Sequence, residues 1–229
     1  MKKMLFAAML LSISSLLLGQ QTEKKKFEFG LIFTGKIDYL KPEFTDWNEL
    51  GISNELNQVN TKNRLGFGLG LLYKFNITDH FAIVPQTILT FQQSQLQYDL
   101  ANQENHQESL LPATVSLPLH FVFTRPLTDQ LESSILLGLR YNIDITDYSI
   151  PSNSMTPFDV YNLNLDKQNF GLDLGVGMVV QTKKFKLKPE LLYSFGLSNL
   201  KNDNGGDIFN DALAEVYQDR ITLRLLFFK

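Results

Sequence analysis

The strongest constraint in this sequence is an alternation of apolar and polar residues that returns in eight separate segments. In residues 26–39 most apolar side chains, from Phe27 to Tyr39, fall on odd positions, whereas Glu28, Lys36 and Asp38 fall on even ones. Successive side chains of a β-strand point to opposite faces, so a period of two predicts a strand with one apolar face. The pattern occupies residues 26–39, 63–76, 80–92, 111–123, 131–145, 169–181, 185–197 and 220–227.

Alternation fits two kinds of barrel, and the connections between the segments help to separate them. A soluble, lipocalin-like barrel and a membrane barrel differ only in which face points inward. Short periplasmic turns and longer extracellular loops are typical of outer-membrane barrels. In this chain the connections are short at 76–80, 125–130 and 182–184, and long at 41–63, 93–109, 147–168 and 198–219.

Aromatic placement also favours the membrane barrel. Aromatic residues gather at segment ends beside the short connections or the chain ends, as the interfacial girdle of a membrane barrel requires. We therefore predict an all-β fold, an eight-stranded antiparallel transmembrane β-barrel with short periplasmic turns and long extracellular loops. The predicted girdle comprises Phe27, Tyr73, Phe75, Phe81, Phe121, Phe123, Phe185 and Phe227.

The polar faces of the segments then point into the barrel. A barrel of eight strands has a lumen just wide enough for side chains to fill, so we expect ion pairs and not a pore. Unpaired charges would be costly there, and a paired Arg140 and Glu132 should tolerate joint replacement by Leu better than either single change. The predicted lumen charge network is Arg64, Lys74, Glu132, Arg140, Asp144, Asp173, Lys186, Lys188, Glu190, Arg220 and Arg224.

The N-terminus carries the features of a secretory signal peptide. Lys2 and Lys3 precede an apolar run from Met4 to Leu18, which is too short for the roughly 20 residues of a transmembrane helix. We predict a signal peptide over residues 1–20, with cleavage near its end, and a barrel domain over residues 21–229. The mature protein is then expected in the outer membrane.

Composition excludes several classes of function. The chain has no Cys and only three His, which leaves no thiolate chemistry and little room for a metal centre. A formal net charge of −3 gives no basic surface for nucleic acid. Ser116 and His120 share a face but lie four residues apart, about 13 Å along a strand and too far for a nucleophile and base. We predict no catalytic residues, no metal, no cofactor and no small-molecule substrate.

The long connections contain apolar side chains that are candidates for contact with a partner. Trp47 is the only tryptophan, and Phe44 and Ile52 lie near it in residues 41–63. Residues 211–217 could form a helical turn with Leu213 and Val216 on one side. Apolar side chains in long loops mark partner contacts or a lid on the barrel mouth, and the sequence leaves both possibilities open.

Several segments together resemble the PorT family of Bacteroidetes outer-membrane β-barrels. The resemblance covers nearly the whole mature chain. Its most specific parts are Pro118 and the triplet Lys188, Pro189 and Glu190, with Gly196, Leu197 and Asn199 following. The segments are KKKFEFGLIFTG, GFGLGLLYKF, FAIVPQTILTF, TVSLPLHFVFTR, LLGLRYNIDI, NFGLDLGVGM and FKLKPELLYSFGLSNL.

This resemblance implies a small integral outer-membrane protein and, for one branch of the family, a part in type IX secretion and gliding. The expected function is thus a non-enzymatic component or assembly factor of that secretion machine. Expected partners are outer-membrane lipid and other proteins of the machine. The alternative is a small surface barrel with a porin-like or adhesin-like role and no part in secretion.

Overall fold

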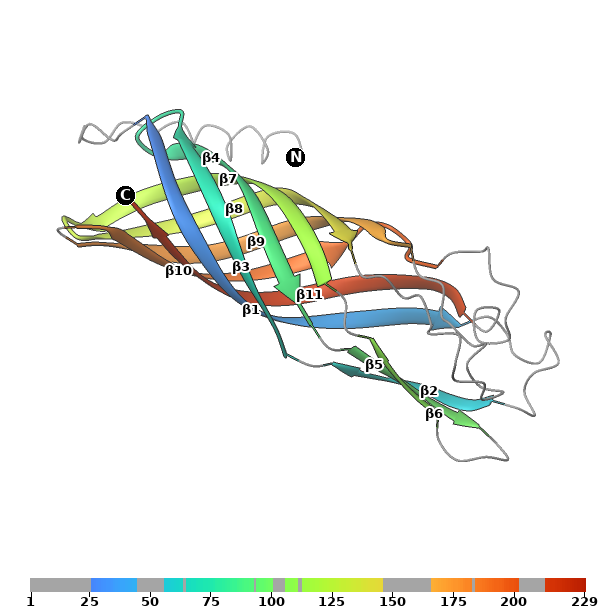
Figure 1. The fold of residues 1–229 in the computed structure, drawn as a ribbon. Coiled ribbons are helices and arrows are strands. Elements are labelled where there is room, and N and C mark those ends of the chain that lie inside the picture. Colours follow the sequence, from blue (N-terminus) through green and yellow to red (C-terminus); the bar gives the residue numbers. More distant parts are fainter. Residues whose placement is uncertain are drawn as a thin grey trace, which may run out of the picture.

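The structure is a computed structural model that describes residues 26–44, 56–63, 65–92, 94–100, 106–110, 113–145, 166–182, 184–201 and 213–229. These residues form one long barrel with a smaller sheet beyond one of its ends (Figure 1). The strands are β1 (Phe27–Phe44), β2 (Leu56–Asn63), β3 (Leu65–Asn76), β4 (Phe81–Phe91), β5 (Ser94–Leu100), β6 (His106–Leu110), β7 (Ala113–Thr128), β8 (Leu131–Asp144), β9 (Gln168–Gln181), β10 (Lys186–Gly196) and β11 (Leu213–Phe228).

Eight of these strands close into a barrel in the order β1-β11-β10-β9-β8-β7-β4-β3. Every neighbouring pair is antiparallel, and the first and last strands of the chain complete the ring, with register pairs from Gly30 and Phe228 to Phe44 and Leu213. Closure pairs every strand on both sides and leaves no open sheet edge. The predicted eight-stranded antiparallel barrel is confirmed.

The two faces of the barrel wall have opposite chemistry. In β3, Leu65 is 76% exposed and points outward together with Phe67 and Leu69, whereas Gly66 and Gly68 are buried inside. The same alternation holds around the ring, and the outer surface is a continuous apolar belt. A soluble barrel would show the reverse arrangement, because such a belt is stable only in lipid. The barrel is therefore built to span a membrane.

The two ends of the barrel differ. At the turn end, short turns at residues 77–80, 129–130 and 182–185 join neighbouring strands, and β1 begins and β11 ends there. At the opposite end, which we call the loop end, β1 ends and β11 begins, and the smaller sheet lies beyond it (Figure 1). In the part of the chain that the structure describes, no helix is long and apolar enough to cross a membrane.

Two of the predicted long loops contain strands. β2, β5 and β6 form a three-stranded sheet in the order β2-β5-β6, which we call the loop-end sheet. One residue separates β2 from β3, and two residues separate each of the pairs β4 and β5, and β6 and β7. Three barrel strands are therefore prolonged beyond the barrel. Their sequences, LNQVNTKN, SQLQYDL and HQESL, are largely polar, so a search for apolar alternation overlooks them.

The helical turn expected at residues 211–217 is wrong, because β11 begins at Leu213. Val216 is buried and packs with Leu200 and Leu40, so it stabilises the loop end of the barrel and offers no surface to a partner. Phe44 and Leu213 pair through their backbones at the ends of β1 and β11, and their side chains lie outside the described residues. Trp47 and Ile52 lie outside them as well.

The N-terminal prediction has no structural counterpart, because residues 1–25 lie outside the described residues. The signal peptide at residues 1–20 therefore stays a prediction. The connection predicted at residues 125–130 is shorter than expected, because β7 continues to Thr128, with a shift of register after Pro126.

The apolar belt predicts that the effect of a surface charge depends on its depth in the membrane. Leu139 lies near the middle of β8 and is 57% exposed, and Ile77 lies in a turn and is 58% exposed. Leu139→Arg should lower the free energy of unfolding in lipid vesicles by about 2–4 kcal/mol, and Ile77→Arg by about 0–1 kcal/mol. Urea titrations of the refolded proteins measure both values. Equal losses would contradict the assignment of the belt to lipid.

Candidate functional site: the polar interior of the barrel

The candidate site is the interior, where all eight barrel strands contribute buried polar side chains. They alternate with the outward apolar residues, so the strand period of two brings them together. The apolar side chains of Ile32, Leu72, Leu136 and Leu226 are also buried and belong to one hydrophobic cluster. The charged side chains form three groups along the barrel, which we call the turn-end cluster, the mid-barrel network and the loop-end cluster.

The turn-end cluster is centred on Glu28. Lys186 Nζ donates to Glu28 Oε1 and Oε2 at 3.0 and 3.1 Å, and Asn76 Nδ2 donates to Oε1 at 3.1 Å. Lys74 Nζ lies 3.7 Å from the same carboxylate. Both ammonium groups also lie over the ring of Phe228, at 5.3 and 5.8 Å from its centroid. Glu28 is fully buried, and these donors compensate the loss of its hydration.

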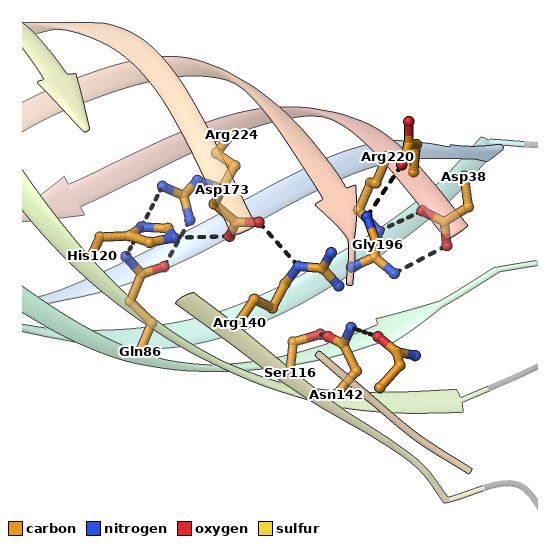
Figure 2. A network of polar contacts seen from close by, with 12 residues as sticks. Asp38, Gln86, Ser116, His120, Arg140, Asn142, Asp173, Gly196, Arg220 and Arg224 are labelled. Carbon is orange, nitrogen blue, oxygen red and sulfur yellow. Dashed lines mark hydrogen bonds and ion pairs between the residues drawn. The ribbon is translucent and has the colours of Figure 1, made fainter. Parts of the chain in front are cut away.

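The mid-barrel network links side chains of six strands, and Figure 2 labels its members on five of them. Asp173 accepts from Arg140 Nε at 3.1 Å and from His120 Nε2 at 3.0 Å. Arg224 donates to Gln86 Oε1 at 2.8 Å and pairs with Glu190. Glu190 lies on β10, so the network joins β4, β7, β8, β9, β10 and β11.

The hydrogen bonds determine the tautomer of His120. Gln86 Oε1 accepts from Arg224, so the amide group of Gln86 turns its Nε2 toward His120 Nδ1, at 2.9 Å. Arg224 Nη2 also lies 3.2 Å from Nδ1. Both neighbours of Nδ1 are donors, so Nδ1 accepts and the ring proton lies on Nε2, from which it is donated to Asp173. His120 is therefore neutral in this network.

The loop-end cluster is centred on Asp38. It pairs with Arg220, whose Nη2 lies at 3.1 Å, and with Lys36 Nζ at 3.3 Å. Gln218 Nε2 also donates to it at 3.0 Å. Farther out, Asp219 pairs with Lys41 and accepts from Tyr193 Oη at 2.5 Å and from the backbone N–H of Gly196 at 3.1 Å.

Side chains fill the space between these groups. Cavities of about 30 and 10 Å³ lie in the lumen. The larger has room for about one or two water molecules and the smaller for about one at most, so neither holds a larger solute. This packing is what a barrel of eight strands allows.

The predicted lumen residues fall into three groups: buried, partly exposed, and outside the described residues. Eight of them are buried in the interior, namely Lys74, Glu132, Arg140, Asp173, Lys188, Glu190, Arg220 and Arg224. Lys186 and Asp144 are partly exposed near the two ends, and Arg64 lies outside the described residues. Lys188 pairs with Glu190 at 2.6 Å, and Glu132 accepts from Gln181 Nε2 at 3.0 Å.

The expected pairing of Arg140 with Glu132 is wrong. The two residues lie eight positions apart on β8, which is about 26 Å along a strand. Arg140 instead pairs with Asp173 on the neighbouring strand β9. Position on one strand determines the face of a side chain, whereas its partner depends on which strands are neighbours.

Sequence reasoning missed several members of the interior. Glu28, Lys36 and Asp38 occupy the polar positions of β1 and form ion pairs, so the alternation already contained the signal. A pattern of charged positions does not contain the neutral residues Gln86, His120 and Asn142, which are also buried. Gln86 and His120 connect Arg224 with Asp173, and Asn142 binds Ser116 and Asn169.

The eight predicted girdle residues lie on the outer side of the wall near the turn end, and their rings contact one another or adjacent rings. Phe27 lies 6.1 Å from Tyr73 and 5.4 Å from Phe75 between ring centroids. Three further contacts involve the remaining members: Phe81 with Phe121 at 6.3 Å, Phe185 with Phe227 at 6.2 Å, and Phe123 with His80 at 6.1 Å.

Among the described interior residues, the candidate nucleophile Ser116 and the candidate base His120 do not form a pair. Ser116 Oγ donates to Asn142 at 2.6 Å and does not meet His120. The pair of His120 and Asp173 has the geometry of a base and its orienting carboxylate, but His120 is 0% exposed, so no substrate reaches it. Among the described residues, no group of three or more His, Cys, Asp or Glu side chains could hold a metal ion.

Comparison with known proteins finds similarity in fold alone. No family model matches the sequence, and no curated protein matches it. Among solved structures, the outer membrane protein OprG from Pseudomonas aeruginosa is 12% identical, over 88% of this chain and 93% of that chain, with a TM-score of 0.48. Neisserial surface protein A is 9% identical, over 88% and 96%, with a TM-score of 0.48. The outer membrane protein AlkL is 12% identical, over 92% of each chain, with a TM-score of 0.44.

The close packing at His120 predicts that Gly138 cannot carry a side chain. A Cβ atom there would collide with the ring of His120 and lie 2.6 Å from the carbonyl oxygen of Leu119. Gly138→Ala should therefore lower the free energy of unfolding by about 1–3 kcal/mol. Gly35→Ala is the matched control, because a Cβ at Gly35 meets nothing within 4 Å. A shift in the urea midpoint that is equal for both variants would contradict the packing described here.

The ion pair of Arg140 with Asp173 predicts a coupling between the two residues. Arg140→Leu and Asp173→Leu should each destabilise the barrel by about 3–5 kcal/mol, because each leaves a buried charge without its partner. The double variant should lose less than the sum, by about 0.5–3 kcal/mol. Arg140→Leu combined with Glu132→Leu is the control and should be additive, since these side chains lie far apart on β8. Additive behaviour of Arg140 with Asp173 in urea unfolding would rule out the pair.

Proposed function

We propose that this protein is an integral outer-membrane β-barrel that serves, without catalysis, as a component or assembly factor of a type IX secretion machine. Its barrel anchors the protein in the bilayer, and its surfaces outside the bilayer make the contacts that matter for secretion. The PorT-like segments of the sequence support the choice of machine. The closed interior of the barrel supports a role in contact and assembly over a role in conduction.

The outer-membrane location rests on the wall of the barrel and on the N-terminus. An apolar belt surrounds a polar interior, and closed barrels with this arrangement are inserted in outer membranes. The predicted signal peptide at residues 1–20 would direct the chain out of the cytoplasm. With short turns on the periplasmic side, the turn end faces the periplasm and the loop end faces the cell exterior.

The closed interior of the barrel is the main observation that supports the proposal. Buried polar contacts fill the lumen at the turn end, in the middle and at the loop end. Glu28 binds Lys186 two strands away, and Arg224 binds Gln86 three strands away around the ring, whereas Asp38 pairs with Arg220 on the neighbouring strand. The cavities between them have volumes of about 30 and 10 Å³. A solute would have to break several buried ion pairs to pass, and each broken pair would be costly. The working surfaces are therefore the two ends of the barrel.

The loop-end sheet is the surface best placed for a protein partner. It prolongs three barrel strands beyond the apolar belt (Figure 1). β2 and β6 are its outer strands, with β5 between them, and an outer strand can accept a further strand through backbone hydrogen bonds. The partners in this proposal are outer-membrane lipid around the belt and proteins of the secretion machine at the ends, with no nucleic acid and no small-molecule substrate.

An adhesin-like surface barrel is the second candidate function, and the same loop-end sheet favours it. A sheet held outside the cell by a rigid barrel can contact a surface or a host molecule without any secretion role. A porin-like role has less support, because the interior is filled. Steady conductance of the purified protein in planar lipid bilayers would favour the porin-like role over the adhesin-like role.

Deletion of the gene in its native host tests the secretion role. We expect type IX cargo proteins to be lost from the culture supernatant, while a periplasmic marker stays inside the cells and a plasmid copy restores secretion. Normal cargo levels in the deletion strain would overturn the role and leave the adhesin-like barrel in first place.

A shortened variant then tests the loop-end sheet. Residues 94–110, which contain β5 and β6, join β4 to β7 and can be replaced by a short turn without altering a barrel strand. If the sheet makes the contact, this variant should reach the outer membrane at the normal level but fail to restore secretion. Full rescue by the shortened variant would exclude the sheet as the contact surface.

A further inference from the structure

A cavity of about 30 Å³ lies in the lumen where the mid-barrel network meets the loop-end cluster. We call it the mid-barrel cavity. Its charged lining is unbalanced, with four basic side chains and one acidic side chain. The residues that matter for its chemistry are Thr34, Lys36, Arg140, Asp173, Arg220 and Arg224.

Three donors in this lining have no acceptor among the described residues, namely Arg140 Nη1, Thr34 Oγ1 and Arg224 Nε. Arg140 is buried and uses its Nε to bind Asp173 at 3.1 Å, while its Nη1 has no hydrogen-bond partner. Thr34 Oγ1 is also buried without a partner. Figure 2 shows Arg140 between Asp173 on one side and the pair of Asp38 and Arg220 on the other. Leaving a polar group unpaired in a protein interior is costly, and more so for a charged group, so these three atoms point to a missing acceptor.

The surroundings of the cavity carry excess positive charge. The mid-barrel network and the loop-end cluster bring together five buried cations, which are Lys36, Arg140, Lys188, Arg220 and Arg224. The buried acids paired with them are three, namely Asp38, Asp173 and Glu190. With the pair of Asp219 and Lys41 set aside, the five basic and three acidic side chains leave a formal excess of two positive charges among these described residues, and His120 adds none because it is neutral. Uncompensated charge in a low-dielectric interior is strongly unfavourable.

We propose that the mid-barrel cavity binds a small inorganic anion of the size of chloride, with Arg140 Nη1 and Thr34 Oγ1 as hydrogen-bond donors. A cavity that holds about one or two water molecules accommodates a monatomic anion and excludes larger ligands. The anion neutralises part of the excess charge and supplies the acceptor that both donors lack. This site is independent of the secretion role and makes the anion a structural part of the barrel.

Water fits the cavity less well than an anion does. The carboxylate oxygens of Asp173 already accept from Arg140 and His120, so the acceptors left for a water molecule are mainly hydroxyl groups, which can also donate. A water molecule would leave the net charge of the lining unchanged. A halide accepts only, which matches this lining.

Anomalous X-ray scattering from bromide gives a direct test. The full-length mature protein is refolded in detergent with gluconate as the anion, because gluconate is too large for the cavity, and its crystals are soaked in sodium bromide. We expect an anomalous peak inside the barrel within hydrogen-bond distance of Arg140 Nη1 and Thr34 Oγ1. Peaks confined to the outer surface, an adventitious ion only, would overturn the site.

Stability in solution gives a second, independent test. At constant ionic strength, replacing gluconate by chloride should raise the urea midpoint of the wild-type protein until the site is saturated. Thr34→Val keeps the size and charge of the lining but removes one donor, and it should weaken chloride binding about tenfold. Thr124→Val, at a buried threonine outside this cavity, is the matched control and should bind chloride as the wild type does.

Two outcomes of the stability test would overturn the proposal. One is a wild-type urea midpoint that is the same in chloride and in gluconate. The other is an equal response to chloride of Thr34→Val and Thr124→Val, which would place the anion effect elsewhere on the protein. Both variants change a hydroxyl to a methyl group, so a difference in their stability without anion does not affect the comparison of their chloride responses.

Discussion

The structure depends on the pairing of β1 with β11, the first and last strands of the chain. The hydrocarbon region of a bilayer holds no water to bind free backbone groups, so a sheet spans it only when its edges are closed. Once the ring is closed, each strand has one side toward lipid and one side toward the lumen. The apolar belt, the aromatic girdle and the polar interior all follow from that division of faces.

Closure at eight strands also determines what the interior can be. The lumen is too narrow for water to hydrate charges fully, and the acidic side chains inside it pair with basic ones. The chain supports this arrangement with glycines at crowded positions: a Cβ at Gly171 would collide with the guanidinium group of Arg140, and one at Gly138 with the ring of His120. The result is a filled barrel whose lumen holds cavities of about 30 and 10 Å³, so the surfaces that we propose for partner contact lie at its two ends.

Much of the fold could be predicted from the sequence, because a period of two depends on neighbouring residues alone. All eight barrel strands and the direction of their faces follow from it. The polar strands β2, β5 and β6 could not be found in this way, since strands outside the lipid need no apolar face. β11 begins earlier than the pattern indicated, for the same reason. The charged residues Glu28, Lys36 and Asp38 of β1, by contrast, occupy polar positions of the alternation, so the sequence alone indicates that they face the interior.

The sequence by itself determined which side chains point inward, because alternation along a strand is local. Only the tertiary structure decided which of them meet. Arg140 pairs with Asp173 on β9, and Asp38 on β1 pairs with Arg220 on β11, far along the chain. These partners depend on strand order, register and the tilt that closes the barrel. The mid-barrel cavity and its unpaired donors depend on the same geometry, since a missing acceptor appears only when side chains of several strands are placed together.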